Sequence, residues 1–98
     1  MKHFDGTAVA TALPYRALVA AIEAAFRDDV TTPLRQHYDI EVPHGTDGAM
    51  LVMPAWRSDR YIVVKMVSIF PDNAARDLAS VLGIVVLIDA ASGQPLAT

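Results

Sequence analysis

The chain has 98 residues, of which 53 % are hydrophobic, and a formal net charge of −3. A chain of this length forms one domain, and its apolar content excludes an intrinsically disordered protein. The slight acidity, without a basic stripe, argues against nucleic-acid binding through phosphate neutralisation. The absence of cysteine excludes disulfide scaffolds, thiolate metal sites and cysteine nucleophiles.

Signals for membranes, export and nucleotide binding are missing from the sequence. The longest apolar run, Val81–Ile88, is far shorter than the ~20 residues of a spanning helix. Residues 1–5 are followed by no apolar signal-peptide segment, so we expect a cytoplasmic protein without a membrane partner. None of the five glycines falls in a G-x-G-x-x-G or G-x-x-x-x-G-K-[ST] motif, so no phosphate-binding loop is recognisable.

The first thirty residues predict mainly helix. Residues 2–5 read as a short strand, and Thr7 can cap a short helix over residues 8–13. A second helix is predicted over residues 14–29, with Pro14 in its first turn. Its apolar face, at helical spacing, consists of Tyr15, Leu18, Ile22, Ala25 and Phe26.

After residue 30 the apolar period changes from 3.6 to 2, which predicts strands. These strands cover residues 37–42, 49–54, 61–70 and 83–89, and a return strand begins at Pro95. The first strand has one wet face, whereas residues 83–89 form a continuous apolar run expected to be buried on both faces. Residues 72–80 predict an irregular excursion or a helical turn. The sum is an α+β domain with a helical hairpin packed on a mostly antiparallel sheet.

The last predicted strand ends at Thr98, a few residues after its turn. A strand this short has little to pair with. It indicates a fragment, or a fold that needs a further C-terminal segment. The alternative is a short edge strand at a natural C-terminus.

Four motifs occur in a fixed order. They are Met53-Pro54-Ala55, the Lys65 strand ending in Phe70-Pro71-Asp72-Asn73, the apolar strand from Gly83, and Asp89-Ala90-Ala91-Ser92-Gly93-Gln94-Pro95-Leu96-Ala97. In this order they resemble the N-terminal part of the ornithine cyclodeaminase/mu-crystallin family. The resemblance covers essentially the whole chain. It departs from the family at residues 77–80, where Asp-Leu-Ala-Ser replaces Gly-Leu-Pro-Thr or Gly-Leu-Pro-Ser.

Members of that family are more than three times as long and carry a Rossmann cofactor domain. The resemblance therefore implies that residues 1–98 are a single substrate-binding and dimerisation domain of an NAD(P)-dependent enzyme, without its cofactor domain. It implies a homodimer and a small amino acid or cyclic imino acid as ligand. We expect this chain to bind no cofactor and to be inactive by itself.

Lys65 is the first candidate site residue. A lysine among Val, Ile and Met in a strand is costly to bury without a partner. Pointing into a cleft, it would be a fixed cation for a carboxylate, and the resemblance makes it the family's carboxylate-binding lysine. The alternative is the wet side of an alternating strand, although Val63 and Val67 share its face.

Arg35 and Ser80 are the other candidates. Arginine offers two parallel donors that match a carboxylate, and the resemblance makes Arg35 the second carboxylate ligand; the alternative is an ordinary loop arginine. Ser80 matches the family's Thr/Ser near the nicotinamide and the substrate; the alternative is a strand-entry hydroxyl. No acid–base pair and no metal site is expected, because the three histidines are widely spaced.

Two functions remain open at this point. The first is the substrate-binding half of an ornithine cyclodeaminase-like dehydrogenase or imine reductase, with Arg35 and Lys65 holding the ligand. The second is a non-catalytic module for dimerisation or small-ligand binding, built on the apolar strands 61–70 and 83–89. The nature of the amino or imino acid, and NAD versus NADP, are not encoded in these residues.

Overall fold

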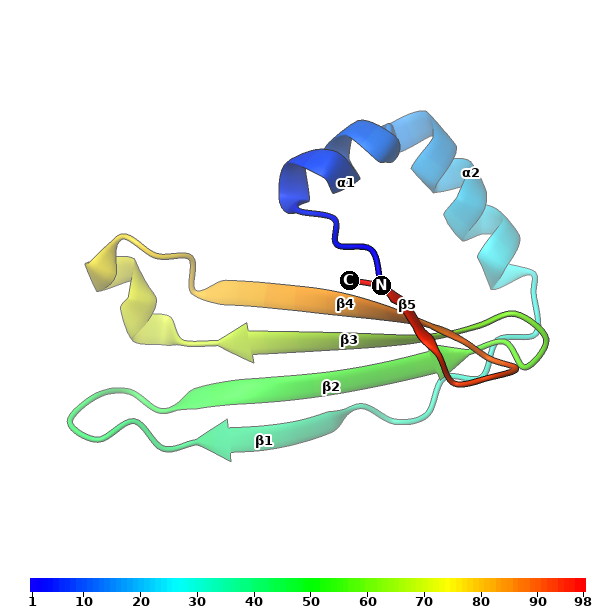
Figure 1. Cartoon of the computed structure of the whole chain (residues 1–98). Helices are drawn as coiled ribbons and strands as arrows, with labels where there is room; N and C mark the ends of the chain where they lie inside the picture. The colour runs from blue at the N-terminus through cyan, green and yellow to red at the C-terminus, as the bar shows by residue number, and fades with distance from the viewer.

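The computed structural model describes residues 1–98 as three helices and one five-stranded sheet (Figure 1). The helices are α1 (Gly6–Ala12), α2 (Tyr15–Phe26) and the 3₁₀ helix η1 (Pro71–Arg76). The strands are β1 (Gln36–Ile40), β2 (Gly48–Trp56), β3 (Tyr61–Ile69), β4 (Val81–Asp89) and β5 (Pro95–Ala97). The predicted α+β class and the antiparallel sheet are confirmed.

The sheet is an antiparallel meander in the order β1-β2-β3-β4-β5. Residues directly opposite one another in neighbouring strands share a face, and successive residues of a strand alternate between faces. The registers Met53↔Lys65 and Lys65↔Val85 therefore place the odd-numbered residues of β1–β4 on one face. The even-numbered residues lie on the other.

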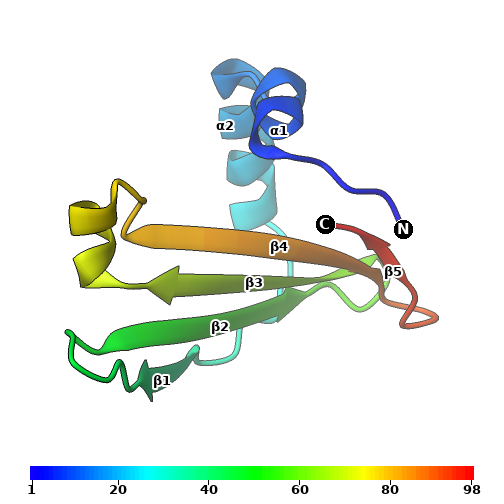
Figure 2. The same cartoon turned by 60° about the vertical axis from the view of Figure 1, so that its left-hand side comes forward.

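Both long helices lie over the face with the odd-numbered residues, which we call the helix side (Figures 1 and 2). An apolar groove of about 520 Å³ separates α1 from β4 and is lined by Val9 and Leu13 above Val85 and Leu87. The face with the even-numbered residues, the outer side, is covered by no element of the chain. The helix side therefore faces α1 and α2, whereas no element of the chain faces the outer side.

The helices form an arch because α1 and α2 meet at 81°. The predicted cap Thr7 is wrong: the Asp5 carboxylate accepts the Ala8 N–H at 2.8 Å, because an extended Asp one residue before the helix reaches the free N–H groups of the first turn. α2 ends at Phe26, three residues earlier than predicted.

No single helix is long and apolar enough to cross a membrane; α1 and α2 pass that test only as a bent pair.

The arch is attached to the sheet at its two ends. At the N-terminus, Lys2 forms a parallel bridge with Ala97, and the Phe4 N–H donates to the Thr98 carbonyl at 2.7 Å. The predicted strand over residues 2–5 is reduced to this bridge. After α2, Thr31 and Trp56 exchange two backbone hydrogen bonds of 2.9 and 3.0 Å.

Few side chains are buried between the arch and the sheet. Only 2 of the 98 residues are buried, and Val67 is the one apolar residue among them. The expected burial of strand 83–89 on both faces is wrong, since Ile84 is 45 % and Val85 47 % exposed. The reason is that the outer side has no second layer and the helix side has only the arch. Apolar surface left open on this scale marks interaction sites.

The β4–β5 hairpin is held by one carboxylate. Asp89 Oδ1 accepts the backbone N–H groups of Ala91 and Ser92 at 2.8 Å and the Ser92 hydroxyl at 3.0 Å. Gly93 follows with a φ of 74°, a conformation that glycine adopts without strain. The hydrogen bonds, led by that of the Ser92 N–H, hold the pKa of Asp89 below its usual value. The hairpin positions β5 against β4 and the N-terminus.

Replacing Asp89 by alanine is expected to lower the thermal midpoint at neutral pH, because three donors lose their acceptor. Since the folded pKa is depressed, the Asp89 contribution is full above the ordinary carboxyl pKa and is lost as the pH falls through the folded pKa. The difference between wild type and Asp89→Ala is therefore expected to shrink below about pH 4. Thermal unfolding by circular dichroism at several pH values measures it. Asp29→Ala, at a carboxylate without a hydrogen-bond partner, is the matched control; an equal loss in both variants contradicts the assignment.

Candidate functional site

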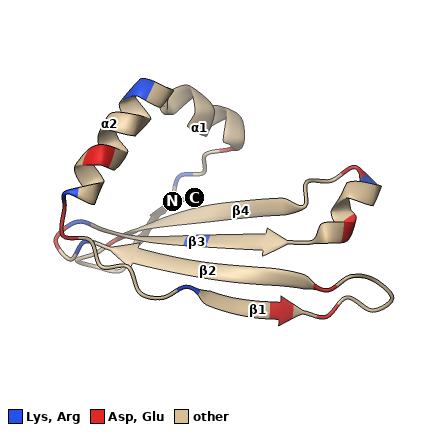
Figure 3. Cartoon of the chain, turned by 180° about the vertical axis from the view of Figure 1, so that it is seen from behind, with Lys and Arg blue, Asp and Glu red and all other residues tan.

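Lys65 lies in the middle of β3 on the helix side of the sheet. Its neighbours across the ladder are Met53 and Val85, and Val63 and Val67 flank it along the strand. It is the only charged residue of β2 and β3 (Figure 3), and it forms no ion pair with any carboxylate of the chain. The predicted face, shared with Val63 and Val67, is confirmed. Lys65 is thus an exposed, unpaired cation on an apolar surface.

Arg35 directly precedes β1. The β1–β2 ladder begins with the pair Gln36–Val52, and the preceding bridge is Thr31–Trp56, so the register changes by one residue in the segment that carries Arg35. Met53, Lys65 and Val85 form one row across the sheet on the helix side, and Arg35 lies beyond this row, in the segment before β1.

Arg35 precedes β1 and Lys65 lies on β3, with β2 between these two strands. Like Lys65, Arg35 is exposed and has no ion-pair partner.

Ser80 lies at the opposite end of the sheet from this row. It directly precedes Val81, the first residue of β4, and its carbonyl accepts the Phe70 N–H at 2.8 Å. Val85 is five positions further along the chain, which corresponds to about 17 Å along an extended strand. The structure therefore leaves Ser80 apart from Lys65.

The segment that carries Ser80 is fixed by two side chains of η1. Asp72 Oδ2 accepts the Thr46 N–H of the β1–β2 loop at 2.7 Å, and Asn73 Nδ2 donates to the Ala79 carbonyl at 3.0 Å. The hydrogen bond from Thr46 is the main reason why the pKa of Asp72 lies below its usual value. Of the two alternatives predicted for residues 72–80, the helical turn is confirmed: the short helix η1 is followed by a turn held by Asn73.

A second charged cluster fixes the other end of the arch. The Arg57 guanidinium pairs with Asp28, just after α2, and donates from Nε to Asp59 Oδ1 at 2.8 Å. The hydrogen bond from Arg57 lowers the pKa of Asp59, and the same bond raises the pKa of Arg57. Sequence reasoning missed this anchor, because its partners are 29 residues apart and share no motif.

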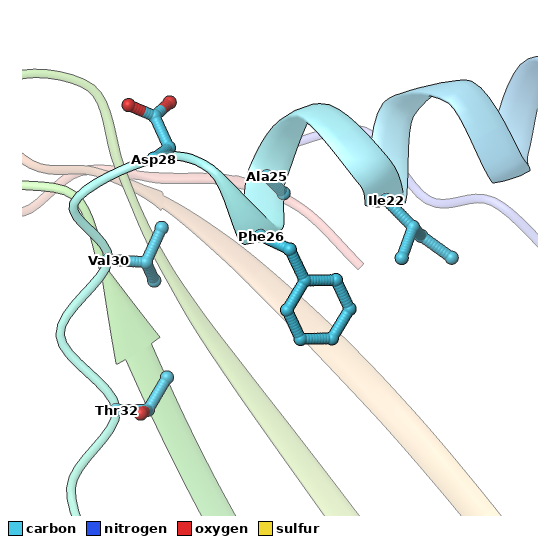
Figure 4. A pocket seen from close by; sticks show the side chains of 6 residues that line it. All are labelled: Ile22, Ala25, Phe26, Asp28, Val30 and Thr32. Carbon is cyan, nitrogen blue, oxygen red and sulfur yellow. The ribbon is translucent and has the colours of Figure 1, made fainter.

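An open pocket lies beside this anchor, under the C-terminal end of α2 (Figure 4). Ile22 and Phe26 point from α2 to the same side, and Val30 and Thr32 face them from the segment that leads to β1. The predicted apolar face of the helix exists, but Phe26 remains 87 % exposed. The pocket is therefore apolar and open, with Asp28 at its rim.

The residues of this chain do not fit a dinucleotide cofactor. Such a cofactor needs a strand–glycine-rich turn–helix unit of a parallel sheet, with its pyrophosphate on the helix N-terminus. Here every strand pairs antiparallel, and the strands follow one another through turns, loops and the short η1. The one glycine with positive φ is Gly93, in the β4–β5 hairpin.

The three histidines lie in different parts of the molecule. His3 Nδ1 contacts the Thr98 hydroxyl at 2.8 Å, His44 sits in the β1–β2 loop, and His37 Nε2 lies 3.3 Å from Asp39 Oδ1 on β1. No group of three or more potential metal-ligating side chains is formed. His37 and Asp39 have odd numbers, so they lie on the helix side with Lys65.

Comparison with known proteins relates this chain to a protein family. Residues 5–98 match the profile of the ornithine cyclodeaminase/mu-crystallin family. The chain belongs to the ornithine cyclodeaminase/mu-crystallin family. The resemblance carried by the four sequence motifs is thereby confirmed.

Relatives within the ornithine cyclodeaminase/mu-crystallin family include named reductases. The chain is 34 % identical over 91 residues to delta(1)-pyrroline-2-carboxylate reductase 1 of Burkholderia multivorans, covering 93 % of this chain and 29 % of the relative. The delta(1)-pyrroline-2-carboxylate reductase of Thermococcus litoralis, solved with NADH and L-proline, superposes with a TM-score of 0.81 at 29 % identity. That alignment covers 99 % of this chain and 31 % of the other.

A third similar protein is a lysine cyclodeaminase, whose structure concerns recognition of L-lysine, L-ornithine and L-2,4-diaminobutyric acid. The TM-score is 0.70 at 26 % identity, over 91 % of this chain and 28 % of that chain. The chain thus spans about 30 % of the length of each of these relatives.

Proposed function

We propose that residues 1–98 are the substrate-binding and dimer-forming domain of an NAD(P)-dependent dehydrogenase or imine reductase of the ornithine cyclodeaminase type. The observation that carries this proposal is the exposed, unpaired Lys65 on the apolar helix side of the sheet. The unpaired Arg35, just before β1, is proposed as the second cation. Two unpaired cations have the chemistry to bind one carboxylate. The ligand class is an α-amino acid or a cyclic α-imino acid.

Each cation has a distinct task in this proposal. The Arg35 guanidinium matches a carboxylate in one plane through two parallel hydrogen bonds, and the Lys65 ammonium adds a point charge. Met53, Val63 and Val85 beside Lys65 offer an apolar floor for a carbon skeleton. Binding the carboxylate at a fixed place orients the rest of a small ligand, which is the contribution that a binding domain makes to catalysis.

Ser80 is proposed as a further substrate contact that approaches from the η1 end of the sheet. Its distance from the Lys65 row means that such a contact requires a ligand or partner surface that extends along β4. Because the residues of this chain do not fit a dinucleotide, we propose that the chain binds no NAD(P) by itself and is inactive alone. Its expected location is the cytoplasm.

The test uses the 98-residue chain with L-proline as the carboxylate probe. We expect titration by two-dimensional NMR to shift the side-chain signals of Arg35 and Lys65. We also expect no NADH from NAD⁺ with L-proline, L-ornithine or L-alanine. Measurable NADH formation contradicts the proposed inactivity, and unshifted Arg35 and Lys65 signals at millimolar L-proline contradict the proposed site.

A second function, dimerisation, is supported by the outer side of the sheet. The even-numbered residues of β1–β4 include no charged side chain. Those at its centre are Val52, Pro54, Val64, Met66, Ile84 and Val86. A charge-free apolar surface of this kind is typical of a subunit interface. We propose that two copies of the chain pack through this face.

A further inference from the structure

Four large apolar side chains of α2 form one exposed stripe along the helix. Tyr15, Val19, Ile22 and Phe26 follow one another at spacings of four, three and four residues. At 3.6 residues per turn, this spacing keeps all four within about 60° of the helix circumference. Their exposed fractions are 86, 60, 47 and 87 %. Neither the sheet nor α1 therefore covers this surface, which we call the α2 stripe.

The spacing of the α2 stripe fits a second helix. Alternating steps of four and three residues are those by which two helices interlock their side chains along a common seam. A surface helix of a folded domain normally turns such a stripe toward its own core. In this chain the stripe points to solvent, so its spacing indicates docking to a helix of another molecule.

The charges beside the α2 stripe indicate which helix fits it. Arg16 and Glu23 lie on the same flank, seven residues apart. A two-fold axis through the middle of the stripe makes two copies of α2 antiparallel and sets each flank against the same flank of the other copy. Arg16 of each copy then faces Glu23 of the other. A parallel pair would instead set this charged flank against the apolar flank that carries Leu18 and Ala25.

The open pocket at the C-terminal end of α2 suits the same arrangement. The two-fold axis places Phe26 of one copy beside Tyr15 of the other. The pocket next to Phe26 has a volume of about 330 Å³ and is lined by Ile22 and Val30, among others (Figure 4). It is large enough to receive a tyrosine ring, and the Asp28 carboxylate at its rim can accept the tyrosine hydroxyl.

We propose that the α2 stripe is a second self-association surface, on which another copy of this chain docks its own α2 in antiparallel orientation. The surface is separate from the outer side of the sheet and from the ligand site, so it depends on neither. A helix of 12 residues covers much less than the ~800 Å² per partner of a stable interface. The association is therefore weak, with a Kd of about 0.1–1 mM.

The test uses Ile84→Asp, which removes the outer-side contact and leaves α2 unchanged. Its amide NMR spectrum is recorded over a concentration range that spans the expected Kd. We expect the amide signals of Val19 and Ile22 to shift with concentration. Adding Val19→Glu is expected to abolish the shifts, because a carboxylate would be desolvated in the middle of the seam without a partner. Ala20→Glu, which adds the same charge off the stripe, is the control and leaves them unchanged.

A charge exchange tests the antiparallel orientation. Glu23→Arg is expected to weaken the association about tenfold, because both charge pairs across the seam become repulsive. Adding Arg16→Glu restores opposite charges across the seam, so the double variant is expected to regain the association. Arg27→Gln is the control, because it breaks the ion pair between Glu23 and Arg27 within α2 and leaves the pair across the seam intact.

Three results would overturn the proposal. The first is an α2 spectrum that does not change with concentration. The second is a set of shifts that survives Val19→Glu or is lost equally in Ala20→Glu, because the contact then does not lie on the stripe. The third is a loss in Glu23→Arg that Arg16→Glu does not restore, because the docked helix is then not an antiparallel α2. If Ile84→Asp does not fold, the wild-type chain serves as the background, since α2 takes no part in the outer-side contact.

Discussion

Replacing Lys65 by methionine is expected to weaken L-proline binding by about 10–100-fold, the cost of losing a charged hydrogen bond of about 1.5–3 kcal/mol. Methionine has nearly the length of lysine and suits a strand of Val, Ile and Met, so the sheet is expected to keep its stability. The loss then reports the missing charge. NMR titration of the chain with L-proline measures it.

Arg35 provides the companion variant. Arg35→Lys keeps the charge but loses the planar pair of donors, so we expect a smaller loss than for Arg35→Gln. Arg60→Gln is the matched control, because Arg60 lies in the β2–β3 turn and forms no ion pair. If the affinity for L-proline falls equally in Arg60→Gln and Lys65→Met, the loss is a general effect of net charge. That result contradicts the two-cation site.

The Lys65 half of this site was predictable from sequence. Residues two positions apart in a strand lie on the same face, so Val63 and Val67 were expected on the face of Lys65. The ladder places them there. Arg35 was predicted only from the family resemblance. It lies outside the β1–β2 ladder, where the register changes by one residue between the Thr31–Trp56 bridge and the Gln36–Val52 pair. The apolar pattern of the sequence does not predict such an irregularity.

The expected burial of residues 83–89 failed for a different reason. Apolar residues in succession predict that both faces of a strand are covered, without saying by what. In this chain the arch touches the sheet mainly at its ends, so β4 keeps exposed valines and isoleucines on both faces. Within residues 1–98 no element covers β4 on both faces, so the apolar run does not report burial here.

The outer side of the sheet yields the second large effect. We expect the wild-type chain to sediment as a dimer of twice 10.6 kDa, and Ile84→Asp to sediment as a monomer. Ile84 is 45 % exposed on the outer side of β4. A carboxylate there would be desolvated in the interface without a partner, which costs roughly 2–5 kcal/mol and weakens the dimer by about 30-fold to several thousand-fold. Sedimentation velocity over a range of concentrations measures the shift.

The adjacent residue provides the control for this experiment. Val85 is 47 % exposed, in the same strand, but points to the helix side. Val85→Asp therefore adds the same charge to an equally exposed apolar position, and we expect it to leave the dimer intact. If Val85→Asp dissociates the dimer and Ile84→Asp does not, the copies meet through the helix side. That contact would cover Lys65, so dimerisation and ligand binding would compete for one face instead of using two.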